Sequence, residues 1–187
     1  MTQSITPSHV PAGATPESDG VVVGNGPVRV DAFIDFLCPF CRRFELAAEP
    51  TLAGLVADQL ASLVFHPMNF LDAASTTRYS TRAAAASGCA SDRGKFLEYE
   101  HALFVQQPPE GGPGLSDEEL IRIGLAIGLD QSFADCVAAG TYLDWPPYVT
   151  AMANAAGVNS TPTVAVQGIV VSPDPETIAA AVTRAQG

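Results

Sequence analysis

The feature that most constrains the fold is a pair of cysteines three positions apart, Cys38 and Cys41, directly after an apolar run. The run, residues 28–34, is typical of a buried β-strand, and the residues that follow, to about Ala53, are predicted to form a helix. This order places Cys38 at the helix N-terminus and Cys41 one turn further along the same face. Unpaired backbone N–H groups and the helix dipole favour a thiolate at Cys38, so the pattern indicates thiol–disulfide exchange.

Two other interpretations of the pair are an inert pair of thiols and half of a zinc site. Zinc normally takes four ligands, often as two such pairs. The sequence has no second C-x-x-C, and the three histidines, His9, His66 and His101, show no ligand spacing. We therefore favour redox chemistry at Cys38 and Cys41, with no metal and no organic cofactor, and we expect structural roles for His66 and His101.

Composition limits the class of protein further. The chain has 187 residues, of which 47% are hydrophobic, enough for the core of one domain with an insertion. With 20 acidic and 9 basic residues, the formal charge is −11, which argues against nucleic-acid binding through a basic surface. No apolar run approaches the roughly 18 residues that span a bilayer, and no secretory signal is visible. Two explanations stay open: a cytoplasmic protein, or an exported one whose leader or anchor is absent from this chain.

The order of predicted elements is β-α-β, then a block of helices, then β-β-α. Residues 1–20 are rich in Ser, Thr, Pro and Gly, and we predict a flexible tail there. Ser116 begins a predicted helix as part of a capping box. The predicted strands cover residues 21–23, 28–35, 61–66, 163–166 and 169–171, and the predicted helices after the first cover 76–90, 92–106, 116–128, 132–139, 148–156 and 173–185.

Two motifs carry a resemblance to a known family: DFLCPFC at residues 35–41 and STPT at residues 160–163. Together, on either side of the helical block, they resemble the motifs of actinobacterial DsbA-like disulfide oxidoreductases. The resemblance covers nearly the whole chain after the tail. It implies an α/β monomer with a thioredoxin-like fold, formed by residues 21–74 and 157–187, and an inserted all-helical domain, formed by residues 75–156.

The resemblance also implies roles for residues around the cysteine pair. In this family the peptide bond before the proline of the second motif is cis, so Pro162 would face the C-x-x-C and turn the backbone of Thr161 toward Cys38. That backbone could then bind a substrate chain in extended form. The alternative is an ordinary trans proline at the start of a strand. Pro39 and Phe40 would tune the redox pair, and Phe40 stands where enterobacterial members have His, which predicts a less stabilised thiolate.

The charged neighbours of the pair have more than one interpretation. Asp35 could accept the proton of Cys41, or only cap the end of the strand, and we favour the capping role. Arg42 and Arg43 could compensate in part for the missing His, although we favour solvated positions for both. Glu45, one turn past Cys41, is expected to be solvated.

Five large apolar side chains could form a substrate surface beside the cysteines. For most of them, packing in the core is the favoured role. They are Phe36, Phe40, Met68, Phe70 and Trp145.

The remaining cysteines, Cys89 and Cys136, both fall in the predicted helical insertion. Some actinobacterial DsbA-like proteins carry a structural disulfide in this domain, so the resemblance implies one between Cys89 and Cys136. The alternative is a pair of buried free cysteines, which are common in cores. A structural disulfide would imply an oxidising compartment. It therefore favours an extracytoplasmic location, in the cell envelope or secreted, over a cytoplasmic one.

The resemblance implies a thiol:disulfide oxidoreductase that forms disulfides in exported proteins. Its partners would be reduced or unfolded exported proteins and a membrane reoxidase of VKOR or DsbB type. One alternative is a disulfide reductase or isomerase of the same fold. Another is a cytoplasmic reductase of the DsbA family that depends on a low-molecular-weight thiol. A non-catalytic binding module on a thioredoxin scaffold is disfavoured because both Cys38 and Cys41 are retained.

Overall fold

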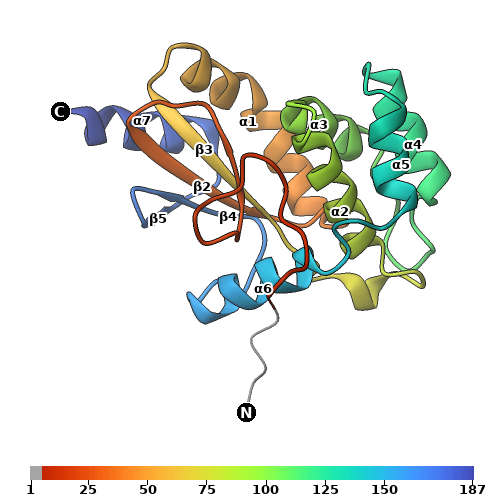
Figure 1. The fold of residues 1–187 in the computed structure, drawn as a ribbon. Helices are drawn as coiled ribbons and strands as arrows, with labels where there is room; N and C mark the ends of the chain where they lie inside the picture. Colours follow the sequence, from red (N-terminus) through yellow and green to blue (C-terminus); the bar gives the residue numbers. More distant parts are fainter. Residues whose placement is uncertain (1–5) are drawn as a thin grey trace.

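The computed structural model describes residues 6–187, so the first five residues of the predicted tail lie outside the described residues. The described chain forms a five-stranded mixed sheet with helices on both faces and a group of helices at one end (Figure 1). Its strands are β1 Val21–Val23, β2 Val28–Ile34, β3 Ala61–Pro67, β4 Thr163–Val166 and β5 Ile169–Val171. Its helices are α1 Pro39–Ala57, the short 3₁₀ helix η1 Asp72–Ala74, α2 Tyr79–Ser91, α3 Phe96–Val105, α4 Asp117–Ala126, α5 Gln131–Ala138, α6 Trp145–Ala155 and α7 Pro175–Gln186.

The central strand of the sheet is β2, in the order β1-β3-β2-β4-β5. β2 and β3 are parallel and are joined through α1, whereas the other neighbouring pairs are antiparallel. In the antiparallel pair of β2 and β4, Phe33 lies opposite Thr163. The chain that enters β4 therefore lies beside the chain that leaves β2, and this register brings the two sequence motifs to the same end of the sheet.

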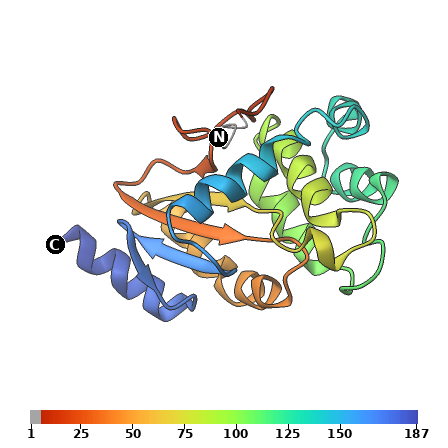
Figure 2. The same cartoon turned by 90° about the horizontal axis from the view of Figure 1, so that it is seen from below.

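The helices fall into two layers on the sheet and one separate group. α1 and α7 contact each other and cover one face, while α6 lies across the other face against β3 (Figure 2). α2, α3, α4 and α5 pack mainly on one another and meet the sheet layers where α3 contacts α1 and α2 contacts α6. Of the predicted insertion over residues 75–156, only the part before α6 thus forms the separate group. Within the described residues, no helix is both long and apolar enough to cross a bilayer.

Local side-chain caps explain where several helices begin. Ser116 accepts a hydrogen bond from the backbone N–H of Glu119, whose carboxylate accepts one from the backbone N–H of Ser116, so the predicted capping box is confirmed. Asp130 caps α5 in a similar way, and Asp174 caps α7 directly before Pro175. The first residue of each of these helices is set by side chains within four positions of it in the sequence. The sequence alone can therefore predict where these helices begin.

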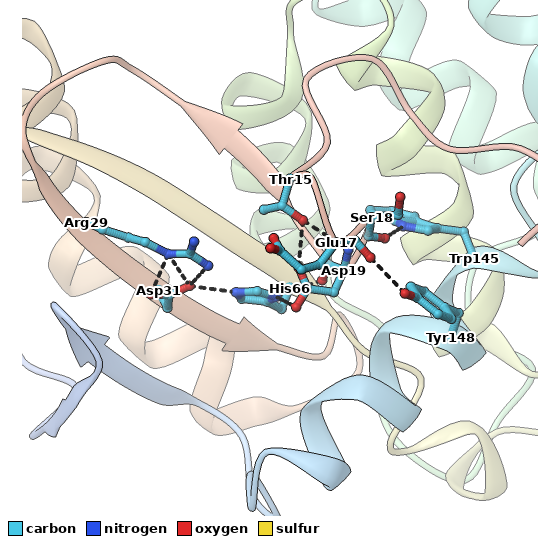
Figure 3. Close-up of polar contacts among 9 residues, drawn as sticks. All are labelled: Thr15, Glu17, Ser18, Asp19, Arg29, Asp31, His66, Trp145 and Tyr148. Carbon is cyan, nitrogen blue, oxygen red and sulfur yellow. Dashed lines mark hydrogen bonds and ion pairs between the residues drawn. The ribbon is translucent and has the colours of Figure 1, made fainter. Parts of the chain in front are cut away.

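The predicted flexible tail is wrong for residues 6–20, which lie along the sheet and α6 (Figure 3). The indole N–H of Trp145 donates to the carbonyl oxygen of Ser18 at 2.8 Å, and the hydroxyl of Tyr148 donates to that of Glu17 at 2.7 Å. Both donors belong to α6, far away in the sequence. The segment is ordered because partners from another element satisfy its backbone, and a polar local composition cannot reveal such partners.

A buried histidine holds the end of the same segment (Figure 3). His66 Nδ1 lies 2.7 Å from the carbonyl oxygen of Asp19, and Nε2 lies 2.9 Å from a carboxylate oxygen of Asp31. The ring therefore connects the N-terminal segment to β2 through one nitrogen on each side. The ring stacks on Phe33 with centroids 4.1 Å apart, and Arg29 donates to Asp31 at 2.7 Å. His66 therefore has the structural role that the sequence predicts.

Candidate active site

The cysteine pair lies at the start of α1, where the sequence predicts it. Cys38 is the capping residue, with extended backbone (φ −72°, ψ 117°), Pro39 opens the helix, and Cys41 lies in the first turn. Both cysteines are free thiols. Cys38 is 4% exposed and Cys41 is 0% exposed, so Cys38 is the sulfur that another molecule can reach first.

The two thiols have opposite pKa shifts. A hydrogen bond from the Cys41 thiol has the largest effect on Cys38, and it outweighs burial, so the pKa of Cys38 falls to about 6 from an ordinary value of 9.0. Hydrogen bonds from Thr161 and from the backbone amides of Cys41 and Phe40 lower it further. Burial, reinforced by the neighbouring Cys38, raises the pKa of Cys41 well above its ordinary value. At neutral pH the pair is therefore a thiolate beside a thiol, which suits exchange chemistry.

The second motif lies against the first. The peptide bond between Thr161 and Pro162 is cis, and the carbonyl oxygen of Thr161 is 3.5 Å from Cys38 Sγ. These residues directly precede β4, and the register of β4 on β2 carries them to the end of β2 from which Cys38 follows. The pairing of two strands thus brings together residues that the helical group separates in the sequence.

Asp35 is fully buried and begins the cysteine loop, which is the connection from β2 to α1 over residues 35–38. Its carboxylate accepts hydrogen bonds from the backbone N–H of Leu37 at 2.9 Å, that of Leu71 at 2.8 Å, and the hydroxyl of Ser80 at 2.7 Å. Burial raises its pKa to about 6 despite these bonds. Toward Cys41 it presents its backbone N–H, 3.5 Å from the sulfur. The carboxylate caps the end of β2, the role favoured from the sequence, and links three segments around the site.

Two contacts from α3 support the cysteine loop, and sequence analysis missed them. Gln107, just after α3, donates from Nε2 to the carbonyl oxygens of Phe36 and Cys38, at 2.9 and 3.0 Å. Arg42 Nε donates to the carbonyl oxygen of Phe104 at 3.0 Å. No local pattern marks Gln107, because its partners lie about 70 positions away in the sequence.

Most of the five apolar side chains considered for a substrate surface pack in the core, the role favoured from the sequence, and two are exposed. Phe40 is 60% exposed, and Phe70, directly before the Leu71 that contacts the buried acid, is 38% exposed. The guanidinium of Arg43 lies 4.6 Å from the centre of the Phe40 ring. The other three predicted members are fully buried core residues: Phe36, Met68 and Trp145.

Glu45 is not solvated as expected, and this prediction is wrong. Its residue is 2% exposed, and His101 Nδ1 from α3 lies 3.1 Å from one of its carboxylate oxygens. The helical period explains the burial, because Cys41, Ala48 and Leu52 form the buried stripe of α1 and Glu45 falls within it. The helical spacing of these residues is visible in the sequence, but the prediction of a solvated side chain follows from the charge of Glu45 alone.

The helical group contains a disulfide between Cys89 of α2 and Cys136 of α5, with 47 positions between the two residues in sequence and 5.9 Å between their Cα atoms. It therefore closes a loop that includes α3 and α4. Among residues 6–187, no group of three or more His, Cys, Asp or Glu side chains is arranged to hold a metal ion.

Comparison with known proteins identifies relatives over nearly the whole chain. A family model described as thioredoxin matches residues 17–184. The structure is similar to the reduced disulfide bond oxidoreductase DsbG of Mycobacterium tuberculosis, with a TM-score of 0.81, 31% identity, and coverage of 93% of this chain and 90% of that chain. It is similar to reduced DsbA of the same organism, with a TM-score of 0.80, 31% identity, and coverage of 90% and 93%. These likenesses confirm the predicted thioredoxin-like fold with inserted helices.

A curated relative is the serine/threonine-protein kinase PknE of Mycobacterium tuberculosis strain H37Rv. It is 33% identical over 135 residues, which cover 67% of this chain but only 24% of the kinase. The match therefore concerns about a quarter of that protein.

Proposed function

The chain belongs to the thioredoxin family, and from this premise we propose that it introduces disulfide bonds into exported proteins by exchange through Cys38 and Cys41. The observation that carries the proposal is the pKa of Cys38, lowered to about 6 beside a protonated Cys41. A stabilised thiolate favours the dithiol form of the enzyme and makes Cys38 a good leaving group. An enzyme whose dithiol form is favoured gives its disulfide away.

The proposed reaction begins with the Cys38–Cys41 disulfide. A substrate thiolate attacks Cys38 Sγ, a substrate–Cys38 bond forms, and Cys41 leaves as a thiolate that takes up a proton because of its raised pKa. A second substrate thiolate then attacks the substrate sulfur of the mixed disulfide, and Cys38 leaves as its stabilised thiolate. The substrate gains one disulfide and loses two electrons, which the enzyme now holds as a dithiol.

We assign substrate binding to the chain around Thr161 and Pro162. Backbone groups at the start of a strand can bind an extended peptide, and the Thr161 carbonyl already lies beside Cys38 Sγ. Phe40, two positions after Cys38, supplies exposed apolar surface, and Phe70, beside the Leu71 that donates to Asp35, supplies a second exposed ring. Such a site recognises reduced, unfolded chains in general because it contacts backbone and apolar side chains.

The proposed partners are reduced exported proteins and a membrane reoxidase of VKOR or DsbB type, with the enzyme in the cell envelope or secreted. The disulfide between Cys89 and Cys136 supports an oxidising compartment. In cells, Cys41→Ser should accumulate mixed disulfides at Cys38, which mass spectrometry would identify, and Cys38→Ser should accumulate none. Trapped proteins drawn from the cytoplasm alone would contradict the assigned compartment.

The direction of exchange is tested by the equilibrium reduction potential of the Cys38–Cys41 pair in a glutathione buffer. We expect a value on the oxidising side, from about −120 to −200 mV. A value near about −270 mV, that of a thioredoxin-like reductant, would overturn the oxidase direction and assign the protein a reducing role.

A further inference from the structure

A cavity of about 880 Å³ lies between α1, α3 and the β1–β3 side of the sheet. Its volume falls in the range of small-molecule sites, about 300–1,000 Å³. Neither Cys38 nor Cys41 is among its lining residues. The cavity is therefore separate from the redox site, although α1 contributes to both.

Most of the cavity wall is hydrocarbon. Residues from β1, β3 and both helices supply it. Walls of this kind favour a ligand with an apolar body, because its burial removes apolar surface from water. The largest apolar members are Leu52, Leu63, Phe65, Phe96 and Leu97.

Two buried carboxyl groups interrupt this wall. Glu100 is 1% exposed, Glu45 is 2% exposed, and both line the cavity. Burial raises the pKa of each, and the neighbouring Glu45 raises that of Glu100 further. Among residues 6–187, the ion pair at these two carboxyl groups is that of His101 with Glu45, and no ion pair involves Glu100. A buried carboxyl group without a cationic partner is costly to a fold.

The other charged groups at the cavity add to this negative character. Glu49 and Glu98 also line it, whereas no Lys or Arg does so in the part of the chain that the structure describes. The one basic side chain is His101, which already lies against Glu45. The site therefore has more carboxyl groups than basic side chains. An anionic ligand needs the opposite.

From these observations we infer that the cavity is a second binding site, for a small lipophilic amine. The ammonium group lies beside Glu45 and Glu100 and donates to carboxylate oxygens that lack N–H donors. The hydrocarbon part lies against the apolar wall. A neutral molecule of the same shape gains only the apolar contacts, and an anionic one meets the carboxyl groups.

Isothermal titration calorimetry on the full chain at neutral pH tests the inference with octylamine, octanol and octanoate. We expect octylamine to bind at least about tenfold more tightly than octanol, and octanoate most weakly. Glu100→Gln keeps the shape of the side chain and removes a carboxyl group that can give its proton to a bound amine, so it should weaken octylamine binding about tenfold and leave octanol unchanged. Glu45→Gln is the second variant if Glu100→Gln does not fold.

Matched variants locate the site. Glu98→Gln, at an exposed position on the cavity wall, should leave octylamine binding nearly unchanged. Ala53→Phe, which fills part of the cavity from α1, should weaken octylamine and octanol alike. Equal affinities for octylamine and octanol, or no measurable octylamine binding, would overturn the inference. So would a Glu100→Gln variant that alters only the reactivity of Cys38, because the carboxyl pair would then serve the cysteines.

Discussion

At the scale of residues, a few hydrogen bonds separate the roles of two chemically identical side chains. Cys38 and Cys41 lie on the same turn, yet one thiol is acidic and the other is not. The position of Cys38 at a helix N-terminus follows from the sequence, and so does part of its acidity. The largest influence, the hydrogen bond from Cys41, depends on how the first turn closes, and only the structure shows it.

We predict that Cys41→Ala raises the pKa of Cys38 well above about 6, because it removes the largest contribution to the lowered value. Cys41→Ser is the matched control: its hydroxyl can still donate to the thiolate, so the pKa should rise less. The rate of alkylation by iodoacetamide as a function of pH gives both values. A Cys38 pKa that stays at about 6 in Cys41→Ala would show that the Cys41 thiol is not the main cause.

Gln107 is the second residue whose substitution should change the properties of the active site. Gln107→Ala removes a donor from two carbonyl oxygens of the cysteine loop, of which that of Cys38 keeps the backbone N–H of Arg42, so we expect a loss of about 1–2 kcal/mol in the free energy of unfolding. Exchange with glutathione disulfide at Cys38 should also slow. Urea unfolding and stopped-flow kinetics measure the two effects. Gln106→Ala, at the exposed neighbouring position, is the control, and equal effects in both variants would contradict the prediction.

The site residues that could be predicted are those that a local pattern marks. The C-x-x-C after a strand and the Thr-Pro before a strand indicate Cys38, Cys41 and Pro162 without any structure. Glu45 was marked by the helical period of α1 and was missed because of its charge. No local sequence pattern indicates Gln107, because its function depends on where the end of α3 lies relative to residues 36 and 38.

At the scale of elements, the disulfide between α2 and α5 holds the helical group together. We predict that the double variant Cys89→Ala, Cys136→Ala loses about 2–4 kcal/mol of unfolding free energy, because the unfolded chain is no longer constrained by the closed loop. The pKa of Cys38 should not change, since the bond lies outside the active site. Urea unfolding and alkylation kinetics check both statements. Unchanged stability would mean that the helices hold this geometry without the bond.

The elements divide into those fixed by neighbours in sequence and those fixed by distant partners. α4 begins where Ser116 and Glu119 cap it, and the sequence predicts this correctly. Residues 6–20 lack regular structure and have a composition typical of tails, but Trp145 and Tyr148 hold their backbone. Long-range hydrogen bonds to backbone carbonyls leave no trace in composition, which is why this segment was predicted incorrectly.

At the scale of the whole molecule, pH dependence reports on the network that joins the N-terminal segment to the sheet. Burial alone would raise the pKa of Asp31, but hydrogen bonds from His66 and Arg29 outweigh it and hold the pKa below its ordinary value of 3.8. A carboxyl group whose pKa is lower in the folded protein than in the unfolded chain stabilises the fold at a pH above its ordinary pKa. This stabilisation is lost as the pH falls through the pKa that the group has in the folded protein.

Asp31→Asn should therefore destabilise the protein at neutral pH by about 1–3 kcal/mol, because it removes the negative charge that accepts from Arg29 and replaces one acceptor oxygen by an NH2 donor. The difference from the wild type should shrink as the pH falls below 3.8, where Asp31 itself becomes protonated. Urea unfolding across this range tests the sign. Asp58→Asn, at an exposed position, is the control, and a difference that grows in acid would contradict the assignment.

One helix, α1, carries the redox pair at its start and Leu52 of the cavity wall three turns later. This shared support has a thermodynamic consequence, because linkage between two equilibria in one molecule is reciprocal. A lipophilic amine that binds the dithiol form tenfold more tightly than the disulfide form raises the reduction potential by about 30 mV. For such an amine, the reduction potential of the Cys38–Cys41 pair would rise with the concentration of the amine.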